Sequence, residues 1–289
     1  MTLLELLQTS PGWLVTTVLL LGLLVGSFLN VVTLRLPARL QHQWRTECRE
    51  ILGLDGAQEA APPGLVTPRS RCPQCGAAIR ALDNIPLLSW LLLRGQCRDC
   101  GTGISLRYPI VEAITGLLSA WLAWHLGAGW ELVFGLLLTW SLIALTVIDL
   151  DHFLLPDNIT LPLLWAGLLL SLGGWFTDPV SAIIGAAAGY LVLWSTFHLF
   201  RLLTGKEGMG YGDFKLLAAL GAWLGWQALP GIVLLSSLVG AVVGIALIVT
   251  ARQDRSVPIP FGPYLATAGW IMFMWGEQIN QAYLRWAGI

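Results

Sequence analysis

The sequence predicts an all-α polytopic membrane protein with about eight transmembrane helices and one polar, cytoplasmic insert. Of its 289 residues, 56% are hydrophobic and 11% are charged, and the mean hydropathy is +0.71. This composition is far from that of soluble proteins. The apolar residues gather in runs that can cross about 30 Å of hydrocarbon. The fifteen Trp fit the same class, because indole rings favour membrane interfaces.

The first expected span covers Trp13 to Leu34. It ends in the segment Gly26-Ser27-Phe28-Leu29-Asn30, whose small and polar side chains suit close packing between helices. Ordinary helix packing is the preferred interpretation of Ser27 and Asn30.

A polar, basic insert follows, and it sets the orientation. Between Arg35 and Arg107 lie ten of the sixteen Lys and Arg but only six Asp and Glu. The positive-inside rule places such a segment in the cytoplasm. We therefore expect three parts: residues 1–34 as the first transmembrane helix, 35–107 as a cytoplasmic domain, and 108–289 as a seven-helix membrane domain.

The remaining spans are expected at Tyr108–Leu126, Glu131–Ile148, Ile159–Phe176, Val180–Leu203, Phe214–Trp226, Gly231–Val249 and Phe261–Tyr283. The run from Phe214 to Trp226 is too short for a full crossing, so we expect a tilted or half-membrane helix packed against its neighbours.

An acid among glycines precedes that short run, in Gly208-Met209-Gly210-Tyr211-Gly212-Asp213-Phe214-Lys215. Three glycines in five positions indicate a tight, non-helical turn, because each costs about 1 kcal/mol relative to Ala inside a helix. An ionisable residue at membrane depth is a functional-site hypothesis by default, and Asp213 is that residue. The alternative is a cytoplasmic loop with one solvated Asp.

A second acidic cluster runs from Asp149 to Asp157 at the end of the third span. Asp149 still belongs to the apolar run, whereas Asp151 lies beyond it and Asp157 can cap the next helix. In the predicted topology Asp149 and Asp213 reach the same membrane face. Two carboxylates close enough to share a water are the arrangement of aspartic proteases, and the sequence leaves open which of them carries the proton.

The cysteines predict a metal site that makes the insert zinc-ribbon-like. Two C-x-x-C-G knuckles, Cys72/Cys75 and Cys97/Cys100, are separated by 21 residues, a pattern typical of a four-thiolate zinc site. Four protein ligands leave no open position, so the zinc is expected to be structural. A redox dithiol is the alternative. Cys48 has no partner in this pattern and is interpreted as an uninvolved thiol.

Taken together, these motifs resemble the type IV prepilin peptidases. The similarity runs nearly end to end through the segments already quoted and through Asp83-Asn84-Ile85-Pro86-Leu87-Leu88-Ser89-Trp90 and Arg107-Tyr108-Pro109-Ile110-Val111-Glu112. The resemblance implies that Asp149 and Asp213 are the catalytic aspartates and that Cys72, Cys75, Cys97 and Cys100 bind zinc.

The resemblance also implies a bifunctional enzyme of the bacterial inner membrane, with its active site on the cytoplasmic side. It would remove the basic leader from type IV prepilins and type II secretion pseudopilins, cutting after a glycine. It would then N-methylate the new terminus from S-adenosylmethionine, whose binding residues the sequence does not identify. Membrane lipid is an expected partner and nucleic acid is not. The acids near the dyad, Asp151, Asp157 and Glu207, are expected to receive the basic leader.

Two other classes compete with this interpretation. A transporter could use buried aspartates to carry protons or cations, but its acids are expected near the bilayer midplane rather than at helix ends. A presenilin-like intramembrane protease would share the glycine-flanked Asp, but the cysteine knuckles argue against it.

Overall fold

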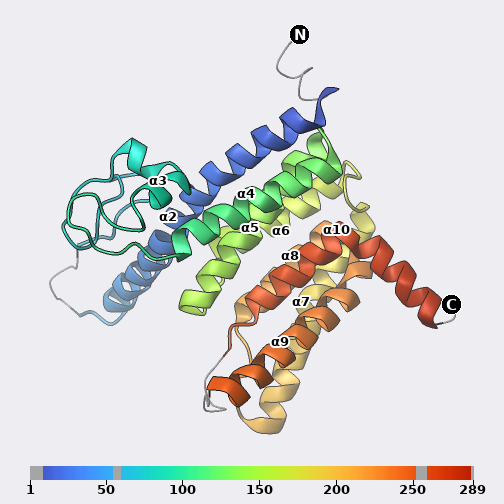
Figure 1. Cartoon of the computed structure of the whole chain (residues 1–289). Helices are drawn as coiled ribbons and strands as arrows, with labels where there is room; N and C mark the ends of the chain where they lie inside the picture. Colours follow the sequence, from blue (N-terminus) through green and yellow to red (C-terminus); the bar gives the residue numbers. More distant parts are fainter. Residues whose placement is uncertain (1–8, 55–59, 252–258, 288–289) are drawn as a thin grey trace. The chain divides into compact units, whose positions relative to one another are not determined.

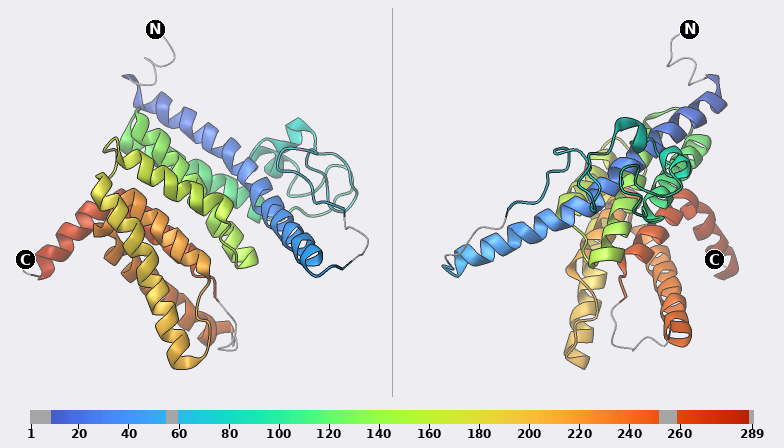
Figure 2. Two further views of the ribbon diagram at one scale, coloured as in Figure 1. Left: turned by 180° about the vertical axis from the view of Figure 1, so that it is seen from behind. Right: turned by 60° about the vertical axis from the view of Figure 1, so that its left-hand side comes forward.

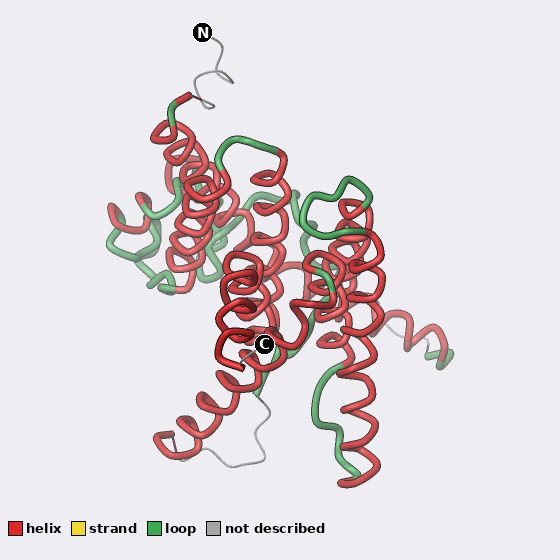
Figure 3. Tube along the Cα trace, turned by 90° about the vertical axis from the view of Figure 1, so that its right-hand side faces the viewer, coloured by secondary structure: helices red, strands yellow, loops and turns green. Residues whose placement is uncertain are grey.

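Helices form almost all of the regular structure of this chain. The computed structural model describes residues 9–54, 60–251 and 259–287. Within these ranges the chain consists of helices and loops, without strands (Figure 3). Two isolated β-bridges join Arg71 to Ala78 and Gln96 to Gly103. The predicted all-α class is confirmed.

Eight helices of fourteen or more residues lie in the described ranges, and each coincides largely with one predicted span (Figure 1). They are α2 (Pro11–Ile51), α4 (Arg107–Leu126), α5 (Trp130–His152), α6 (Asp157–Ser171), α7 (Pro179–Thr204), α8 (Tyr211–Leu224), α9 (Leu229–Ala251) and α10 (Gly262–Ala287). Short helical pieces are η1 (Ala81–Asn84), α3 (Leu88–Leu92) and η2 (Trp226–Ala228).

Five helices of the described chain are long and apolar enough to cross a membrane, as expected of a multi-pass membrane protein. They comprise α2, α4, α5, α7 and the segment Trp226–Leu247. By contrast, α6 has 15 residues and α8 has 14, fewer than the roughly 20 that a perpendicular crossing needs. The count of eight spans therefore stays a prediction.

The chain divides into two compact units, Met1–Ala144 and Leu145–Ile289. The division falls inside α5, so it does not test the boundaries expected at residues 34 and 107.

In the first unit, α2 and α4 lie side by side (Figure 2), and glycines set their close approach. A Cβ atom on Gly22 would lie 2.6 Å from Oγ of Ser119, and one on Gly26 would lie 2.8 Å from Cα of Glu112. Small residues let helix backbones approach in this way. The small-residue segment at the end of the first span is thus a packing surface, as the sequence suggested.

Helix α2 continues well past the point where the hydropathy falls. It runs for 41 residues and includes Pro37, although proline removes one backbone hydrogen bond from a helix interior. The polar residues that follow are mostly good helix formers such as Gln, Arg and Glu. Hydropathy therefore marks the expected end of the apolar span near Leu34, but the helix itself ends at Ile51.

In the second unit, α8 is the buried element. Ten of its fourteen residues are buried, and it packs against α6, α7 and α10. Gly185 of α7 faces Gly221 so closely that a Cβ atom on Gly185 would overlap the carbonyl group of Gly221. Nε1 of the buried Trp223 donates a hydrogen bond to the Leu163 carbonyl of α6 at 2.7 Å. The packing of its buried side chains against these neighbours explains why the short helix α8 is stable at this position.

Candidate active site and metal centre

Asp149 lies in the last turn of α5, and its carboxylate is bound by the start of another helix. Its side chain is buried, with 5% of the residue exposed. Oδ2 accepts a hydrogen bond from the backbone N–H of Gly262 at 3.0 Å, and Gly262 is the first residue of α10. The end of α5 is an unfavourable place for a carboxylate, whereas free N–H groups at a helix N-terminus stabilise one. The N–H group at the beginning of α10 therefore offsets the unfavourable electrostatic effect that the C-terminal end of α5 has on the Asp149 carboxylate.

Gly262 is a site residue that the sequence analysis missed. A Cβ atom at this position would lie 2.6 Å from Oδ2 of Asp149 and 3.0 Å from Cδ2 of Leu155. Only glycine lets the backbone approach the carboxylate so closely. The available signal was the pair Gly262-Pro263 at the start of the last apolar run, which is a helix-start pattern.

Asp213 lies in the first turn of α8, after the glycine-rich segment. Oδ2 accepts a hydrogen bond from the backbone N–H of Gly210 at 3.3 Å, in the manner of a residue that closes a helix N-terminus. The residue is 5% exposed, and its Oδ1 is buried with no hydrogen-bond partner in the described chain. The predicted non-helical turn includes Gly208 and Gly210, whereas Gly212 already belongs to the helix.

The structure brings Asp149 and Asp213 together within the second unit. The two carboxylates lie close enough for their negative charges to repel each other. Leu155 packs against both Gly262, which binds Asp149, and Gly212, which precedes Asp213, because Cβ atoms on these glycines would lie 3.0 and 2.7 Å from its side chain. Two buried carboxylates that repel each other hold a single shared proton more readily than two negative charges. Such a pair can polarise a water molecule.

Two other acids of the second unit, Asp157 and Glu207, have basic partners within the chain. Asp157 receives both hydrogen bonds of a bidentate ion pair from Nζ of Lys215, at 2.7 and 2.8 Å, and Arg201 lies 3.7 Å from Glu207. Asp157 therefore links α6 to α8 instead of capping α6 through its side chain. Two of the three acids expected to receive the leader, Asp157 and Glu207, thus already have basic partners.

In the first unit, the four knuckle cysteines form one cluster that could hold a metal such as zinc. The Sγ atoms of Cys72, Cys75, Cys97 and Cys100 all lie within 4.8 Å of one another, and Cys72 and Cys100 are 3.8 Å apart. Four sulfurs at about 2.3 Å from a tetrahedral zinc would be separated by about 3.8 Å. The geometry of the donors therefore fits the ion. Cys48 is exposed and is not part of the cluster.

The two knuckles have the same backbone structure. In the first, the N–H of Cys72 donates to the Ala77 carbonyl and the N–H of Gly76 donates to the Cys72 carbonyl, both at 2.9 Å. The second repeats this pattern around Cys97 at 2.8 and 2.9 Å. Gly76 and Gly101 both have φ of +72°, a conformation that glycine adopts without steric cost. The glycine after each second cysteine thus allows the turn.

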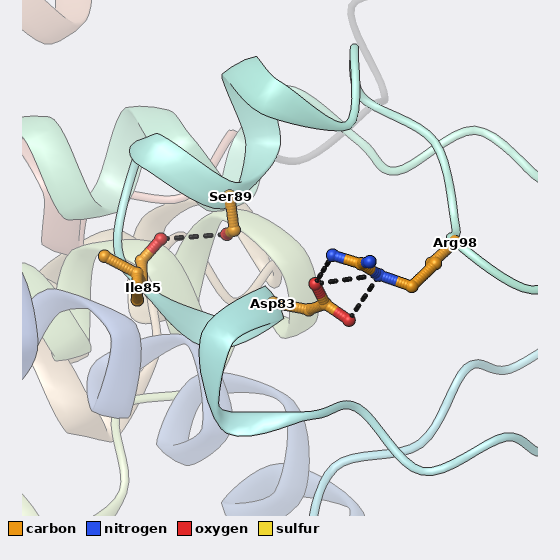
Figure 4. A network of polar contacts seen from close by, with 4 residues as sticks. All are labelled: Asp83, Ile85, Ser89 and Arg98. Atoms are coloured by element: carbon orange, nitrogen blue, oxygen red, sulfur yellow. Dashed lines mark hydrogen bonds and ion pairs between the residues drawn. The ribbon is translucent and has the colours of Figure 1, made fainter.

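Asp83, which lies between the knuckles in the sequence, forms a bidentate ion pair with Arg98 (Figure 4). The guanidinium donates from both Nε and Nη2, which is the strongest arrangement for this pair of groups. Asp83 belongs to η1 and Arg98 to the second knuckle, so the pair fixes one part of the insert against the other. Nearby, Oγ of Ser89 donates to the Ile85 carbonyl at 2.8 Å.

Comparison with known proteins covers both units. The model of the bacterial peptidase A24 N-terminal domain matches residues 20–126, and that of the type IV leader peptidase family matches residues 136–245. A protein of Aeromonas hydrophila named prepilin leader peptidase/N-methyltransferase is 59% identical over 98% of both chains. A protein of the same name from Stutzerimonas stutzeri is 54% identical over 99% of both chains. Another, from Pseudomonas aeruginosa, is 54% identical over 100% of this chain and 99% of the relative. No solved structure matches.

Proposed function

Because the chain belongs to the type IV leader peptidase family, we propose that Asp149 and Asp213 are the catalytic pair with which it cleaves prepilins. The protein is a prepilin leader peptidase and N-methyltransferase, since its relatives of that name match it over nearly the full chain. Membership of this family sets aside the transporter and the presenilin-like alternatives. One observation carries the assignment of the pair: two buried, interacting carboxylates, one of which keeps an unpartnered oxygen.

The pair would act by general acid–base catalysis. The ionised carboxylate takes a proton from a water molecule, whose oxygen attacks the scissile carbonyl carbon. The protonated carboxyl group donates a hydrogen bond to the carbonyl oxygen as negative charge develops there. When the tetrahedral intermediate collapses, the C–N bond breaks and the leaving amine takes a proton from the pair. Oδ1 of Asp213 is available to hold the water before attack.

The substrate would approach from the side of the basic insert, which we place in the cytoplasm of a bacterial inner membrane. Its apolar segment would lie among membrane helices and its basic leader at the surface. Prepilins follow from the family, and we propose pseudopilins as further substrates. Because Asp157 and Glu207 already have basic partners, the apolar segment and the glycine at the cleavage site would contribute more to recognition than these acids do.

The cysteine cluster would hold one structural zinc. Zinc bound by four thiolates has no open coordination position and supplies folding energy rather than catalysis. It would fix the two knuckles that enclose the segment from Ala77 to Gln96. No step of peptide hydrolysis requires it.

Replacing Gly262 by Ala is expected to lower the single-turnover rate constant of prepilin cleavage by about 10- to 100-fold, because displacing a catalytic group by about 1 Å can cost 10²-fold. The new methyl group would lie 2.6 Å from Oδ2 of Asp149. This steric clash would displace the carboxylate from the backbone N–H of residue 262, which donates a hydrogen bond to it. The measurement is single-turnover cleavage of prepilin by purified protein in detergent.

The matched control is Gly276→Ala, in the same helix. Its Cβ would meet Cε of Met272 at 3.5 Å, an ordinary contact, so cleavage should remain at the wild-type rate. Equal rates for both variants would show that Gly262 does not position Asp149.

A further inference from the structure

A cavity of about 620 Å³ lies in the first unit, between the cysteine-bearing insert and helices α2 and α4. Its volume is within the range of small-molecule sites, which combine apolar walls with a few placed polar groups. Its walls include Asn30, Asp83, Trp90, Arg98, Tyr108 and Glu112. Neither carboxylate of the proposed peptidase pair lines it.

Asn30 supplies the first sign that the cavity is built for a ligand. The residue is 5% exposed, and its Nδ2 donates to the Tyr108 carbonyl at 3.1 Å. Its Oδ1 is buried and has no hydrogen-bond partner in the described chain. Buried polar atoms in folded proteins nearly always have partners. A ligand with a hydroxyl, amide or ammonium donor would satisfy this oxygen.

Glu112 supplies the second sign. It is 9% exposed, and its Oε2 accepts a hydrogen bond from the backbone N–H of Leu87 at 2.9 Å. Leu87 has φ of +60°, which is strained for a bulky residue and persists only where the surroundings hold it. Asp83 has Arg98 as its cation, but Glu112 has no basic partner in the described chain. A buried carboxylate without a cation favours a positively charged ligand.

The aromatic wall narrows the class of ligand. Trp90 lines the cavity, and its ring is fixed by a hydrogen bond from Nε1 to the Ile104 carbonyl at 3.1 Å. Its π face can stack on a planar base or bind a cation. A ligand that fits all three groups therefore combines a flat ring, hydroxyl or amine donors, and a positive charge.

We propose that this cavity binds S-adenosylmethionine, the methyl donor of the N-methyltransferase activity, with Glu112 facing its sulfonium and Asn30 accepting a hydrogen bond from another part of the donor. The proposal rests on the proposed function. The donor supplies an electrophilic methyl group on a sulfonium. The neutral amine of the cleaved pilin attacks that methyl carbon, so that an N–C bond forms as the S–C bond breaks. The sulfur leaves as a neutral thioether, and the new ammonium then releases a proton to water.

The test is equilibrium binding of S-adenosylmethionine and of S-adenosylhomocysteine, which lacks the sulfonium charge, measured by calorimetry on the full-length protein in detergent. Glu112→Gln retains an acceptor for the N–H of Leu87 but removes the charge. This variant should bind S-adenosylmethionine about tenfold more weakly, as expected for a lost charge-assisted contact. Its affinity for S-adenosylhomocysteine should fall much less. A merely structural role would weaken both equally. Asn30→Ala should weaken both ligands.

The matched control is Glu47→Gln, an exposed acid of α2 that lies outside the cavity wall and should leave both affinities unchanged. Prepilin cleavage, which does not use these residues, reports that each variant is folded. The proposal would be overturned if both cavity variants bound both ligands with wild-type affinity, or if Glu112→Gln lost the same affinity for both ligands. Neither result would bear on the peptidase and methyltransferase activities themselves. A wild-type protein that neither binds nor uses the donor would overturn the methyltransferase function as well.

Discussion

Replacing either Asp149 or Asp213 by Asn is expected to reduce prepilin cleavage by about 10³-fold or more, because general acid–base groups each contribute about 10²–10⁴-fold. The amide is nearly isosteric with the carboxyl group but cannot accept or deliver the proton. The Asp149→Asn amide oxygen can still accept the hydrogen bond from Gly262, so the variant should fold. The measurement is the single-turnover rate of leader removal.

The double variant tests whether the two residues work as one unit. If they share one proton and one water, removing the second carboxylate costs little after the first has gone. Asp151→Asn serves as the matched control, since Asp151 is exposed and lies two residues further along α5. Its kcat should stay near that of the wild type. A double variant whose loss equals the product of the single losses would show two independent roles.

Replacing any one of the four knuckle cysteines by Ser is expected to remove most of the bound zinc and to loosen residues 65 to 105. Three thiolates bind zinc far less tightly than four, and the free energy of metal binding in such sites is also folding free energy, about 10–16 kcal/mol in small zinc-binding peptides. The measurements are zinc content per chain and the rate of limited proteolysis in the insert.

The control for this series is Cys48→Ser, because Cys48 is an exposed thiol outside the cluster. It should retain one zinc per chain. Wild-type protein purified without chelator and found to contain no zinc would contradict the metal assignment. Cleavage should fall less than stability in the cysteine variants, because the metal takes no part in the proposed hydrolysis.

The helices could be predicted from the sequence because long apolar runs leave few alternatives. The end of α2 could not, since Pro37 and the fall in hydropathy both suggested a stop while the following Gln, Arg and Glu residues continue the helix to Ile51. Hydropathy reports where a span leaves the hydrocarbon, and helix propensity reports where the helix ends.

The cysteines and the aspartates of the proposed sites could also be identified from the sequence. The cysteine spacing predicted a cluster that the structure contains, and glycines around one acid drew attention to Asp213. The partners of these residues were not accessible. Gly262 is 113 residues away from the carboxylate that it binds, and Lys215 neutralises Asp157 across 58 residues. Such long-range pairs depend on the tertiary fold, which the periodicity of hydrophobic residues in the sequence does not determine.

Asn30 shows a different limit. The sequence favoured ordinary helix packing for this residue, and its hydrogen bond to the Tyr108 carbonyl agrees with that interpretation. The unpartnered Oδ1 on the cavity wall is an additional feature. Only the positions of the atoms around it could show that.

We expect Asp149 and Asp213 to hydrolyse the leader and to take no part in methyl transfer, because neither of them lines the cavity proposed for the methyl donor. Both expectations are checked by the mass of two substrates, intact prepilin and pilin already freed of its leader, after incubation with S-adenosylmethionine and the purified Asp213→Asn variant. We predict that prepilin keeps its leader while the freed pilin gains the mass of one methyl group. Loss of the leader at the wild-type rate in this variant would show that Asp213 is not a catalytic residue of the peptidase.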